Sequence, residues 1–238
     1  ALALVYGVLC YLIFLAAFGF GLWFVWTMDR PQPEVPLARA LLINAGLLLL
    51  FALQHSVMAR QGFKRYWTRV VPLALERSTY VLAASLALLA LCSFWQPMPG
   101  VIWNFEAAWA RILLHALFWL GWLQVLVATF ILDHFHLFGM KQAWAHFRNR
   151  PYEPPVFRTP AMYKFVRHPI YVGFLILFWS TPRMTLGHLI LAVVVVAYIL
   201  LGIHLEERDL LNLHGETYRR YRRGVSMLIP WPPRKNPS

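Results

Sequence analysis

The chain has 238 residues, of which 60% are hydrophobic and only 13% are charged, and this balance excludes a soluble domain of ordinary composition. The net charge of +12 does not imply a nucleic-acid partner, because the basic residues gather in the loops between apolar runs. Cytoplasmic loops of membrane proteins are rich in lysine and arginine, so membrane topology explains the charge better. We therefore predict an all-α integral membrane protein that does not bind nucleic acid.

Apolar segments predict a bundle of five to six transmembrane helices. The first, Ala1 to Met28, lacks the basic start and the cleavage site of a signal peptide, so we expect a retained helix. The other segments are 37–58, 78–95, 111–132, 169–181 and 184–205. The segment that starts at Pro169 meets Pro182 after about 20 Å of helix, which is short of the ~30 Å hydrocarbon core. It either spans incompletely or recruits residues before His168, and it forms a C-terminal hairpin with Arg183 at the tip.

Polar residues recur at helical spacing in two of these segments. Asn44 and His55 are separated by close to three turns, so they share a face of the second span. A second series follows spacings of three and four and predicts one stripe along the fourth span and beyond its end: His115, Trp119, Trp122, Leu126, Thr129, Asp133 and His136. We expect Thr129 to bond backbone. Asp133 lies one turn from His136, where a carboxylate can set the tautomer and basicity of an imidazole.

The C-terminal half carries the most unusual sequence features. Residues 138–166 form a basic, proline-rich stretch that we interpret as a cytosolic connector, with Tyr152 near the membrane interface. Pro169 suits the first position of a helix, whose free N–H groups and positive dipole end make an anion site. Glu206 and Glu207 stand where a long apolar run leaves the bilayer. Acidic residues at that depth need partners, which suggests a functional site.

The distribution of basic loops predicts the orientation. The loops after the second and fourth spans and the C-terminal tail are strongly basic, whereas the loops after the first and third spans are not. The positive-inside rule then places both termini in the cytoplasm and residues 96–110 on the opposite side. Six polar residues from four elements are thereby predicted to converge at the cytoplasmic face: His55, Asp133, His136, His168, Glu206 and Glu207.

Three motifs in the C-terminal half resemble those of the isoprenylcysteine carboxyl methyltransferase superfamily. They read Arg167-His168-Pro169-Ile170-Tyr171-Val172-Gly173, then Glu206-Glu207-Arg208-Asp209-Leu210, then Gly215-Glu216-Thr217-Tyr218-Arg219-Arg220-Tyr221. Members of that superfamily are integral-membrane enzymes that use S-adenosylmethionine. Two earlier segments, Gln54–Arg60 and Asp133–Gly139, are more narrowly similar to the bacterial methanethiol S-methyltransferases. This extends the resemblance over most of the chain.

The resemblance implies an S-adenosylmethionine site built by residues 138–238, with residues 1–137 on the substrate side of a single domain. The expected cofactor-binding residues are His168, Tyr171, Gly173, Glu206, Glu207, Tyr218 and Tyr221. The helix start suits the cofactor's carboxylate, and the two glutamates suit its ammonium or ribose hydroxyls. Some of these residues also have a structural explanation. Glu207 could pair with Arg208 or a tail arginine, Tyr218 and Tyr221 could lie at the interface, and Gly173 could serve helix packing.

The narrower resemblance implies methyl transfer to a small thiol, converting methanethiol to dimethyl sulfide. A small thiol is mostly protonated at neutral pH, so a base is useful, and His136 oriented by Asp133 is the candidate. His55 or His134 is the reserve, and a tyrosine or the cofactor's own charge could instead favour the thiolate. We expect the protein to lie in the bacterial inner membrane with its active site at the cytoplasmic face. The bilayer and the thiol are the expected partners, and no obligate protein partner is inferred.

Other functions remain open on the sequence alone. A methyltransferase of the same fold could act on a prenylcysteine or a phospholipid, and sterol reductase-like enzymes share a similar motif but bind NADPH. A membrane electron carrier could hold haem through its histidines: His55, His115, His134, His136 and His204. We predict no metal site, because His134 and His136 would lie on nearly opposite helix faces. The two cysteines, Cys10 and Cys92, lie inside apolar runs and indicate no thiolate site.

Overall fold

The computed structural model describes residues 1–30, 33, 35–153 and 157–230. Part of the predicted loop 29–36 and Pro154 and Pro155 of the predicted connector lie outside the described residues. In the described part of the chain, five helices are long and apolar enough to cross a membrane: α1 (Leu2–Thr27), α2 (Leu37–Ala59), α4 (Leu73–Phe94), α5 (Ala108–Leu132) and α9 (Leu186–Gly224). The prediction of an all-α integral membrane protein is confirmed. A shorter apolar helix, α8 (Pro169–Trp179), has 11 residues and falls short of a full span, as predicted.

The helix α4 starts at Leu73, earlier than the predicted start at Ser78. The prediction was wrong because it treated the charged residues before Ser78 as loop. Glu76 instead occupies the first turn of α4, where a negative charge interacts favourably with the helix dipole. Its carboxylate also lies 3.8 Å from Lys64 Nζ on the short helix α3 (Gln61–Trp67).

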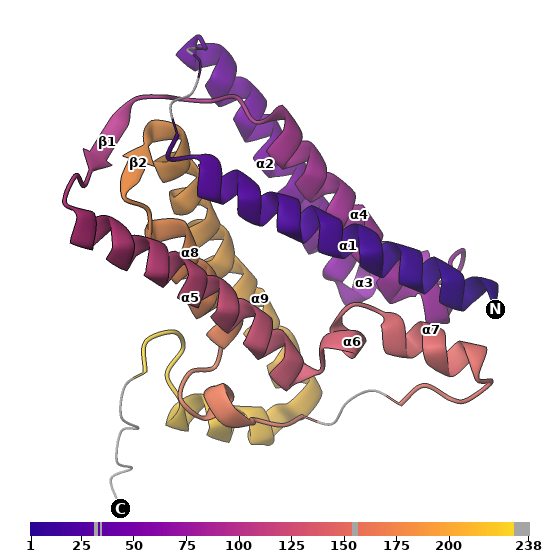
Figure 1. The fold of residues 1–238 in the computed structure, drawn as a ribbon. Coiled ribbons are helices and arrows are strands. Elements are labelled where there is room, and N and C mark those ends of the chain that lie inside the picture. The colour runs from indigo at the N-terminus through magenta and orange to yellow at the C-terminus, as the bar shows by residue number, and fades with distance from the viewer. Residues whose placement is uncertain (31–32, 34, 154–156, 231–238) are drawn as a thin grey trace, which may run out of the picture. The chain divides into compact units, whose positions relative to one another are not determined.

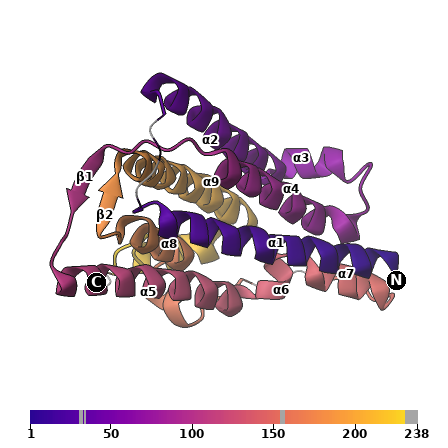
Figure 2. The ribbon, with the colours of Figure 1, turned by 45° about the horizontal axis from the view of Figure 1, so that its top comes forward.

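The chain forms two compact units, of which the first comprises Ala1–Asn104, Asp133–Pro154 and Arg183–Leu189. In this unit α4 packs against both α1 and α2, and α1 also packs against α7 (Met140–Phe147), as Figure 1 and Figure 2 show. Gly7 permits the close approach of α1 to α7, since a Cβ at Gly7 would lie 2.8 Å from Ala143 Cβ. The Tyr6 hydroxyl lies 3.0 Å from Thr79 Oγ1 and ties α1 to the start of α4.

One end of the first unit is closed by a two-stranded antiparallel ladder of β1 (Val101–Asn104) and β2 (Arg183–Thr185) (Figure 1). Arg183 Nη1 also donates a hydrogen bond of 3.2 Å to the carbonyl of Asp29. The segments that follow α1 and α4 therefore meet at one end, together with the tip of the C-terminal hairpin. The alternation of basic and non-basic loops predicted this grouping, and it is confirmed. Which end faces the cytoplasm stays a prediction.

The second unit comprises Phe105–Leu132, Pro155–Pro182 and Ile190–Ser238, and its centre is the packing of α5 against α8. The two helices cross with their backbones nearly in contact at Gly121 and Gly173. A Cβ at Gly121 would lie 2.8 Å from the carbonyl oxygen of Gly173, and a Cβ at Gly173 would lie 2.7 Å from that of Gly121. Helix packing, one of the two explanations considered for Gly173, therefore accounts for this residue. Its contact with a cofactor stays a prediction.

Replacing Gly173 with alanine is expected to lower the stability by about 1–3 kcal/mol, the usual cost of overpacking a tight contact. The added methyl would meet backbone atoms of α5, which cannot move aside as a flexible side chain would. Thermal unfolding in detergent measures the effect. Gly46→Ala is the matched control, since a Cβ at this helical position meets nothing within 4 Å. Equal melting temperatures for Gly173→Ala and wild type would contradict the prediction.

The end of α5 differs from the predicted stripe. The helix stops at Leu132, and Asp133 has a φ of 92°, in the left-handed region, before a new short helix α6 (His134–Leu137) begins. The stripe through Asp133 and His136 is therefore wrong beyond the span. Within α5 the buried positions lie mostly one residue away from the predicted ones: Ala110, Phe118, Gly121, Val125, Ala128 and Thr129. The Thr129 hydroxyl donates to the carbonyl of Leu126 at 2.7 Å, which confirms its predicted backbone bond.

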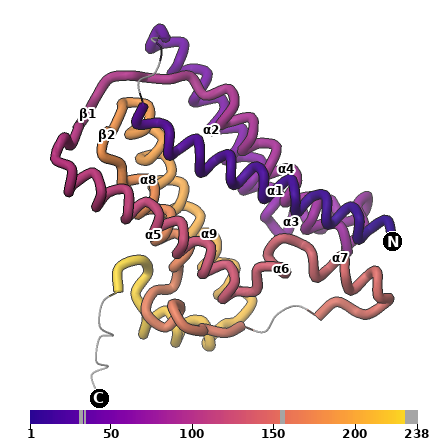
Figure 3. Tube along the Cα trace, in the orientation of Figure 1, coloured from indigo at the N-terminus to yellow at the C-terminus, as the bar shows by residue number. Residues whose placement is uncertain are grey.

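The last helix, α9, continues well past the predicted end at Leu205 and reaches Gly224. The prediction stopped where charged residues begin, but leaving the bilayer does not oblige a helix to end. The helix is interrupted at Gly215, whose φ of 51° and ψ of −123° are not helical. Its C-terminal part turns away from the axis of the long first part (Figure 3). The predicted connector also contains helix, namely α7 and a 3₁₀ turn, η1 (Ala161–Lys164).

Candidate active site

The start of α8 is held by the C-terminal end of the described chain. His168 is the N-cap residue of α8, and Pro169 is its first helical residue. Val166 forms a parallel bridge with Ser226, and the backbone N–H of Arg167 donates to the carbonyl of Ser226 at 2.9 Å. The backbone N–H of His168 donates to the carbonyl of Met227 at 3.3 Å. The R-H-P motif and the chain end therefore form one short paired structure.

The carboxylate of Glu207 on α9 has three partners at this point. Its Oε1 lies 2.7 Å from Arg167 Nε and 3.2 Å from His168 Nε2, and its Oε2 lies 3.7 Å from Arg222 Nη1. Glu207 is buried, and a buried carboxylate is stable only when it is paired in this way. Arg167 also donates through Nη1 to the carbonyls of Arg222 and Val225. The expectation that Glu207 pairs with a tail arginine is confirmed for Arg222, and Arg167 is a partner that was not predicted.

The carboxylate of Glu206 lies at the exposed edge of the same cluster. Its side chain is 47% exposed, whereas that of Glu207 is 11% exposed. The Tyr171 hydroxyl donates to Glu206 Oε2 at 3.1 Å, and His168 Nδ1 lies 3.7 Å from the same oxygen. The imidazole of His168 thus lies between two carboxylates. Because Glu206 is partly exposed, it can bind an ammonium or a hydroxyl of a ligand without losing its neighbours.

An aromatic cluster lies around the C-terminal part of α9. The ring of Tyr218 is 5.8 Å from those of Phe157 and Tyr221, and the ring of His214 is 4.9 Å from that of Phe157. The Tyr221 hydroxyl donates to the carbonyl of Tyr163 at 2.6 Å. Tyr218 is almost fully buried, and its hydroxyl has no hydrogen-bond partner among the described residues. An unpaired buried hydroxyl is costly, so a polar ligand group at Tyr218 would stabilise this cluster.

A second polar cluster belongs to the first unit and surrounds His136. Its Nδ1 hydrogen-bonds with the Tyr152 hydroxyl, and the two rings are nearly parallel with centroids 5.8 Å apart. Gln142 Nε2 lies 3.3 Å from the same nitrogen, and Gln142 Oε1 is buried with no partner in the part of the chain that the structure describes. The imidazole is therefore held on its Nδ1 side.

Asp133 contacts the backbone of His136 rather than its ring. Asp133 Oδ1 accepts the backbone N–H of His136 at 3.2 Å as an N-cap, and Oδ2 forms an ion pair with Lys141 Nζ. Asp133 was expected to orient the imidazole of His136, but in the structure the Tyr152 hydroxyl contacts the ring instead. Neither Tyr152 nor Gln142 was predicted to serve the site. The only sequence signal was the placement of Tyr152 near the interface.

Electrostatics around His136 favour the neutral imidazole. Burial lowers the pKa of His136 below its ordinary value of 6.5, and the Arg77 guanidinium lowers it further. Burial raises the pKa of Asp133, but hydrogen bonds from Lys141 and from the His136 N–H outweigh this effect and lower it overall. Burial also raises the pKa of Tyr152, which therefore stays protonated. A neutral imidazole that carries its proton on Nδ1 keeps a lone pair on Nε2, and this is the tautomer that a base at Nε2 requires.

The two reserve histidines have partners of their own. The Tyr80 hydroxyl lies 3.1 Å from the His55 ring, and the Arg77 guanidinium lies 5.2 Å from the Tyr80 ring centroid. Arg77 Nε also donates to the carbonyl of Leu137 at 2.7 Å, so it links the neighbourhood of His55 to α6. His134 is buried, and its Nε2 lies 2.8 Å from the Tyr11 hydroxyl.

The face shared by Asn44 and His55 is confirmed. Asn44 bonds the backbone of Gln96, just after α4, while His55 bonds Tyr80 on α4. The side chains of Asn44 and His55 are thus both directed to α4 or to the residues just after it.

Comparison with known proteins decides the family. The chain is 50% identical over 238 residues to the methanethiol S-methyltransferase of Mycobacterium tuberculosis (strain ATCC 25618 / H37Rv), covering 98% of each chain. The chain belongs to the methanethiol S-methyltransferase family. It is also 49% identical over 233 residues to the Crocosphaera subtropica (strain ATCC 51142 / BH68) member, covering 96% of this chain and 91% of that one. Nurim of Xenopus laevis is more distant, 32% identical over 188 residues, which are 75% of this chain and 65% of nurim. No family model and no solved structure matches the chain.

In this member of the methanethiol S-methyltransferase family, the predicted site residues fall into two sets. One set lies in the second unit: His168, Tyr171, Gly173, Glu206, Glu207, Tyr218 and Tyr221. The other lies in the first unit: His55, Asp133 and His136. Asp133 and His136 lie together, whereas His55 bonds Tyr80 and is linked to α6 only through Arg77. The convergence of both sets at one depth stays a prediction.

Proposed function

We propose that this protein is an integral-membrane methyltransferase that transfers a methyl group from S-adenosylmethionine to methanethiol and so forms dimethyl sulfide. The observation that carries the proposal is the identity to proteins named methanethiol S-methyltransferase over nearly the whole chain. We place the protein in the bacterial inner membrane, with its active site at the cytoplasmic face. The basic loops support this orientation.

The cluster around α8 and α9 fits S-adenosylmethionine. The buried hydroxyl of Tyr218, which has no partner among the residues that the structure describes, would be satisfied by a polar ligand group, and the partly exposed carboxylate of Glu206 suits the ammonium or the ribose hydroxyls. The positive dipole end of α8, where His168 is the N-cap residue, suits the carboxylate. When bound, S-adenosylmethionine supplies an electrophilic methyl on a sulfonium, so that the thiolate sulfur gains the methyl and S-adenosylhomocysteine leaves.

His136 is the proposed base for the thiol. Nε2 of the neutral imidazole takes the S–H proton, while Tyr152 holds Nδ1 and so fixes the tautomer and the ring plane. Asp133 caps the helix that carries His136 and, with Lys141, keeps that helix in place. The thiol proton leaves on His136 as imidazolium and then passes to solvent. The Asp133 charge favours this protonated form, and Arg77 opposes it.

The function is tested with purified protein in detergent, methyl-labelled S-adenosylmethionine and methanethiol. We expect labelled dimethyl sulfide in the headspace, and none when thiol or protein is omitted. A prenylcysteine analogue and phospholipid vesicles serve as competing acceptors in parallel reactions. Label in either of these acceptors, with no labelled dimethyl sulfide from folded protein, would contradict the proposal.

The pH dependence of kcat follows from the lowered pKa of His136. A group whose pKa is lowered binds its proton only at more acidic pH, so the base form persists below its ordinary value of 6.5. We expect kcat for methanethiol to hold between pH 8 and about pH 6.5 and to fall at more acidic pH. A pH series at saturating substrate measures it. An acidic limb with a midpoint above 7 would assign the limiting proton to another group.

A further inference from the structure

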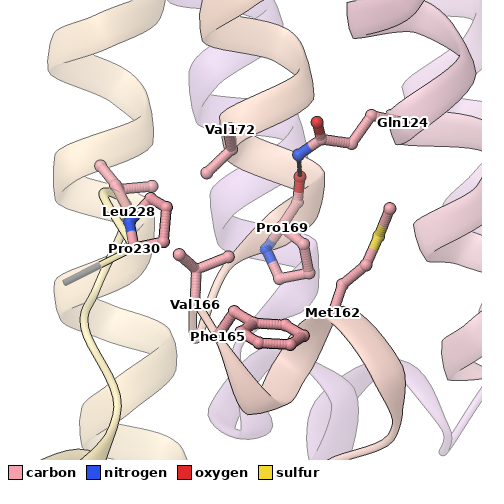
Figure 4. Close-up of a pocket in the computed structure, with 8 residues that line it drawn as sticks. All are labelled: Gln124, Met162, Phe165, Val166, Pro169, Val172, Leu228 and Pro230. Carbon is pink, nitrogen blue, oxygen red and sulfur yellow. Dashed lines mark hydrogen bonds between the residues drawn. The ribbon is translucent and has the colours of Figure 1, made fainter. Parts of the chain in front are cut away.

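The proposed reaction needs a place that holds an anion, because the thiol loses its proton before its sulfur takes the methyl. The cavity of about 230 Å³ at the start of α8 does not provide one (Figure 4). Its wall is mainly apolar, and the amide of Gln124 that reaches it donates to the carbonyl of Pro169 at 3.0 Å. None of the described residues that line this cavity is charged, so a thiolate there would lose its hydration without gaining a counter-charge.

A cation suited to this task lies in the first unit. Arg77, near the start of α4, is half-buried, and its guanidinium lies 5.2 Å from the ring centroid of Tyr80. Its Nε donates to the carbonyl of Leu137 at 2.7 Å. These contacts hold the guanidinium in place without using its terminal nitrogens, Nη1 and Nη2, which have no hydrogen-bond partner in the part of the chain that the structure describes. The N–H donors of these two nitrogens are therefore open to a ligand.

Arg77 also lacks a carboxylate partner. The lysines of the same neighbourhood are paired: Lys64 on α3 lies 3.8 Å from Glu76. Lys141 on α7 forms an ion pair with Asp133. Arg77 itself forms no ion pair with any described residue. A cation that is partly buried without a counter-charge favours the binding of an anion.

The guanidinium of Arg77 lies beside the proposed base. The carbonyl that it holds belongs to the residue directly after His136, and its charge, together with burial, lowers the pKa of that imidazole below the ordinary value of 6.5. The titratable and charged groups around this imidazole are Asp133, which favours its protonation, Arg77, Lys141 and Lys64, which oppose it, and Tyr152, which bonds Nδ1. An anion bound at Arg77 would offset this opposition at the moment when His136 takes a proton.

We propose that Arg77 is a catalytic residue that binds the thiolate, its terminal nitrogens donating to the sulfur while His136 takes the S–H proton. The proposal rests on the proposed thiol methyltransferase function. The S–H bond breaks and leaves its electron pair on the sulfur, which forms the bond to the methyl as the bond between that methyl and the sulfonium breaks. Arg77 stays charged throughout, and its charge-assisted hydrogen bonds lower the pKa of the bound thiol. Dimethyl sulfide is neutral, so it loses this attraction and leaves.

Arg77→Met removes the donors and the charge. We expect kcat/KM for methanethiol to fall about 10–150-fold, the usual cost of losing a hydrogen bond to a charged group. The acidic limb of kcat is expected to move to higher pH, because a positive charge that lowers the pKa of His136 and of the bound thiol is lost. Arg77→Lys keeps the charge, so it is expected to lose less activity and to keep the limb. Arg65→Met, which changes an exposed arginine of α3, is the matched control and is expected to resemble wild type.

Thiocyanate tests the anion site without methyl transfer, since it is a small monoanion with a terminal sulfur. Infrared titration of its C≡N stretching band, with chloride keeping the ionic strength constant, measures its binding. We expect saturable binding to wild type and Arg65→Met, and its loss in Arg77→Met. Thiocyanate is also expected to compete with methanethiol in wild type. This measurement decides the proposal if Arg77→Met does not fold, because inhibition that is not competitive would overturn it.

The other outcomes separate this proposal from the proposed function. Equal binding of thiocyanate by Arg77→Met and wild type would overturn the assignment of Arg77. A loss of kcat that is the same at every pH, together with a lowered melting temperature, would overturn it in favour of a structural role. If wild type methylates methanethiol but neither binds thiocyanate nor is inhibited by it, the thiolate site is rejected and the methyltransferase function is retained. Thiocyanate binding that depends on Arg77, with no methylation of any thiol, would retain the anion site and reject the methyltransferase function.

Discussion

Replacing His136 with alanine is expected to lower kcat for methanethiol by about 10²–10⁴-fold, the usual cost of losing a general base. The affinity for S-adenosylmethionine is expected to stay near wild type, because the residues proposed to hold it belong to the other cluster. Raising the pH is expected to restore part of the activity, since more of the thiol is then already ionised. Stopped-time headspace assays and calorimetry with S-adenosylmethionine measure the two quantities separately.

Two further variants separate a base from a structural histidine. Tyr152→Phe keeps the ring but removes the hydroxyl that bonds Nδ1, so it is expected to lower kcat less than His136→Ala and to shift the pH profile. His146→Ala is the matched control, because His146 is an exposed histidine of α7 and lies outside the cluster. If His136→Ala is stable and turns over normally at neutral pH, the base is another residue. Lowered yield and melting temperature without rescue at high pH would indicate a structural role.

Replacing Glu207 with glutamine is expected to destabilise the protein by about 3–5 kcal/mol, the usual cost of removing one partner from a buried charge pair. The change leaves the Arg167 guanidinium, 2.7 Å away, without its counter-charge in a mostly buried position. Because Arg167 also holds the carbonyls of Arg222 and Val225, the pairing of the chain end with the start of α8 is expected to loosen. Thermal unfolding in detergent and proteolysis of the C-terminal segment measure the loss.

Two other glutamates serve as controls, which show whether the destabilisation is specific to Glu207 or follows the loss of any acidic residue. Glu216→Gln removes a carboxylate that pairs with Arg219 and Arg223 in an exposed setting, where a pair contributes about 0–1 kcal/mol. Glu206→Gln is expected to leave the melting temperature nearly unchanged but to weaken S-adenosylmethionine binding, since its side chain is about half exposed. An unchanged melting temperature for Glu207→Gln would show that Arg167 finds other partners.

The spans were predictable from the sequence because each depends on local composition. The bounds of α1 and α2 agree closely with the prediction, and the shortness of α8 follows from the spacing of Pro169 and Pro182. The end of α5 was not predictable in this way. Polar residues at spacings of three and four continue through Asp133 to His136, and a period in the sequence carries no sign of a residue with positive φ.

The candidate cluster around Glu207 could be anticipated in part from the sequence. Glu206 and Glu207 are adjacent acidic residues at the end of an apolar run, His168 precedes the proline that starts a helix, and Arg167 could have been added as the neighbour of His168. Tyr152, Gln142 and Phe157 could not, because they belong to the connector 138–166, in which no helix was predicted. Their contacts with His136 and Tyr218 arise only from the tertiary fold.

The ladder of β1 and β2 also imposes an order on the assembly of the protein in the membrane. Its strands stand at the two ends of a long chain segment that contains α5, α6, α7 and α8, so β1 is synthesised well before its partner exists. Closing such a segment costs entropy that only a completed contact repays, and non-local pairings of this kind form slowly. Arg183, at the tip of the hairpin, must lie beside Asn104 before β2 can pair with β1. The ladder and the hydrogen bond to the Asp29 carbonyl then hold Arg183 in this position. We therefore expect the pairing of β1 with β2 to be a late step of folding, after insertion of the C-terminal hairpin.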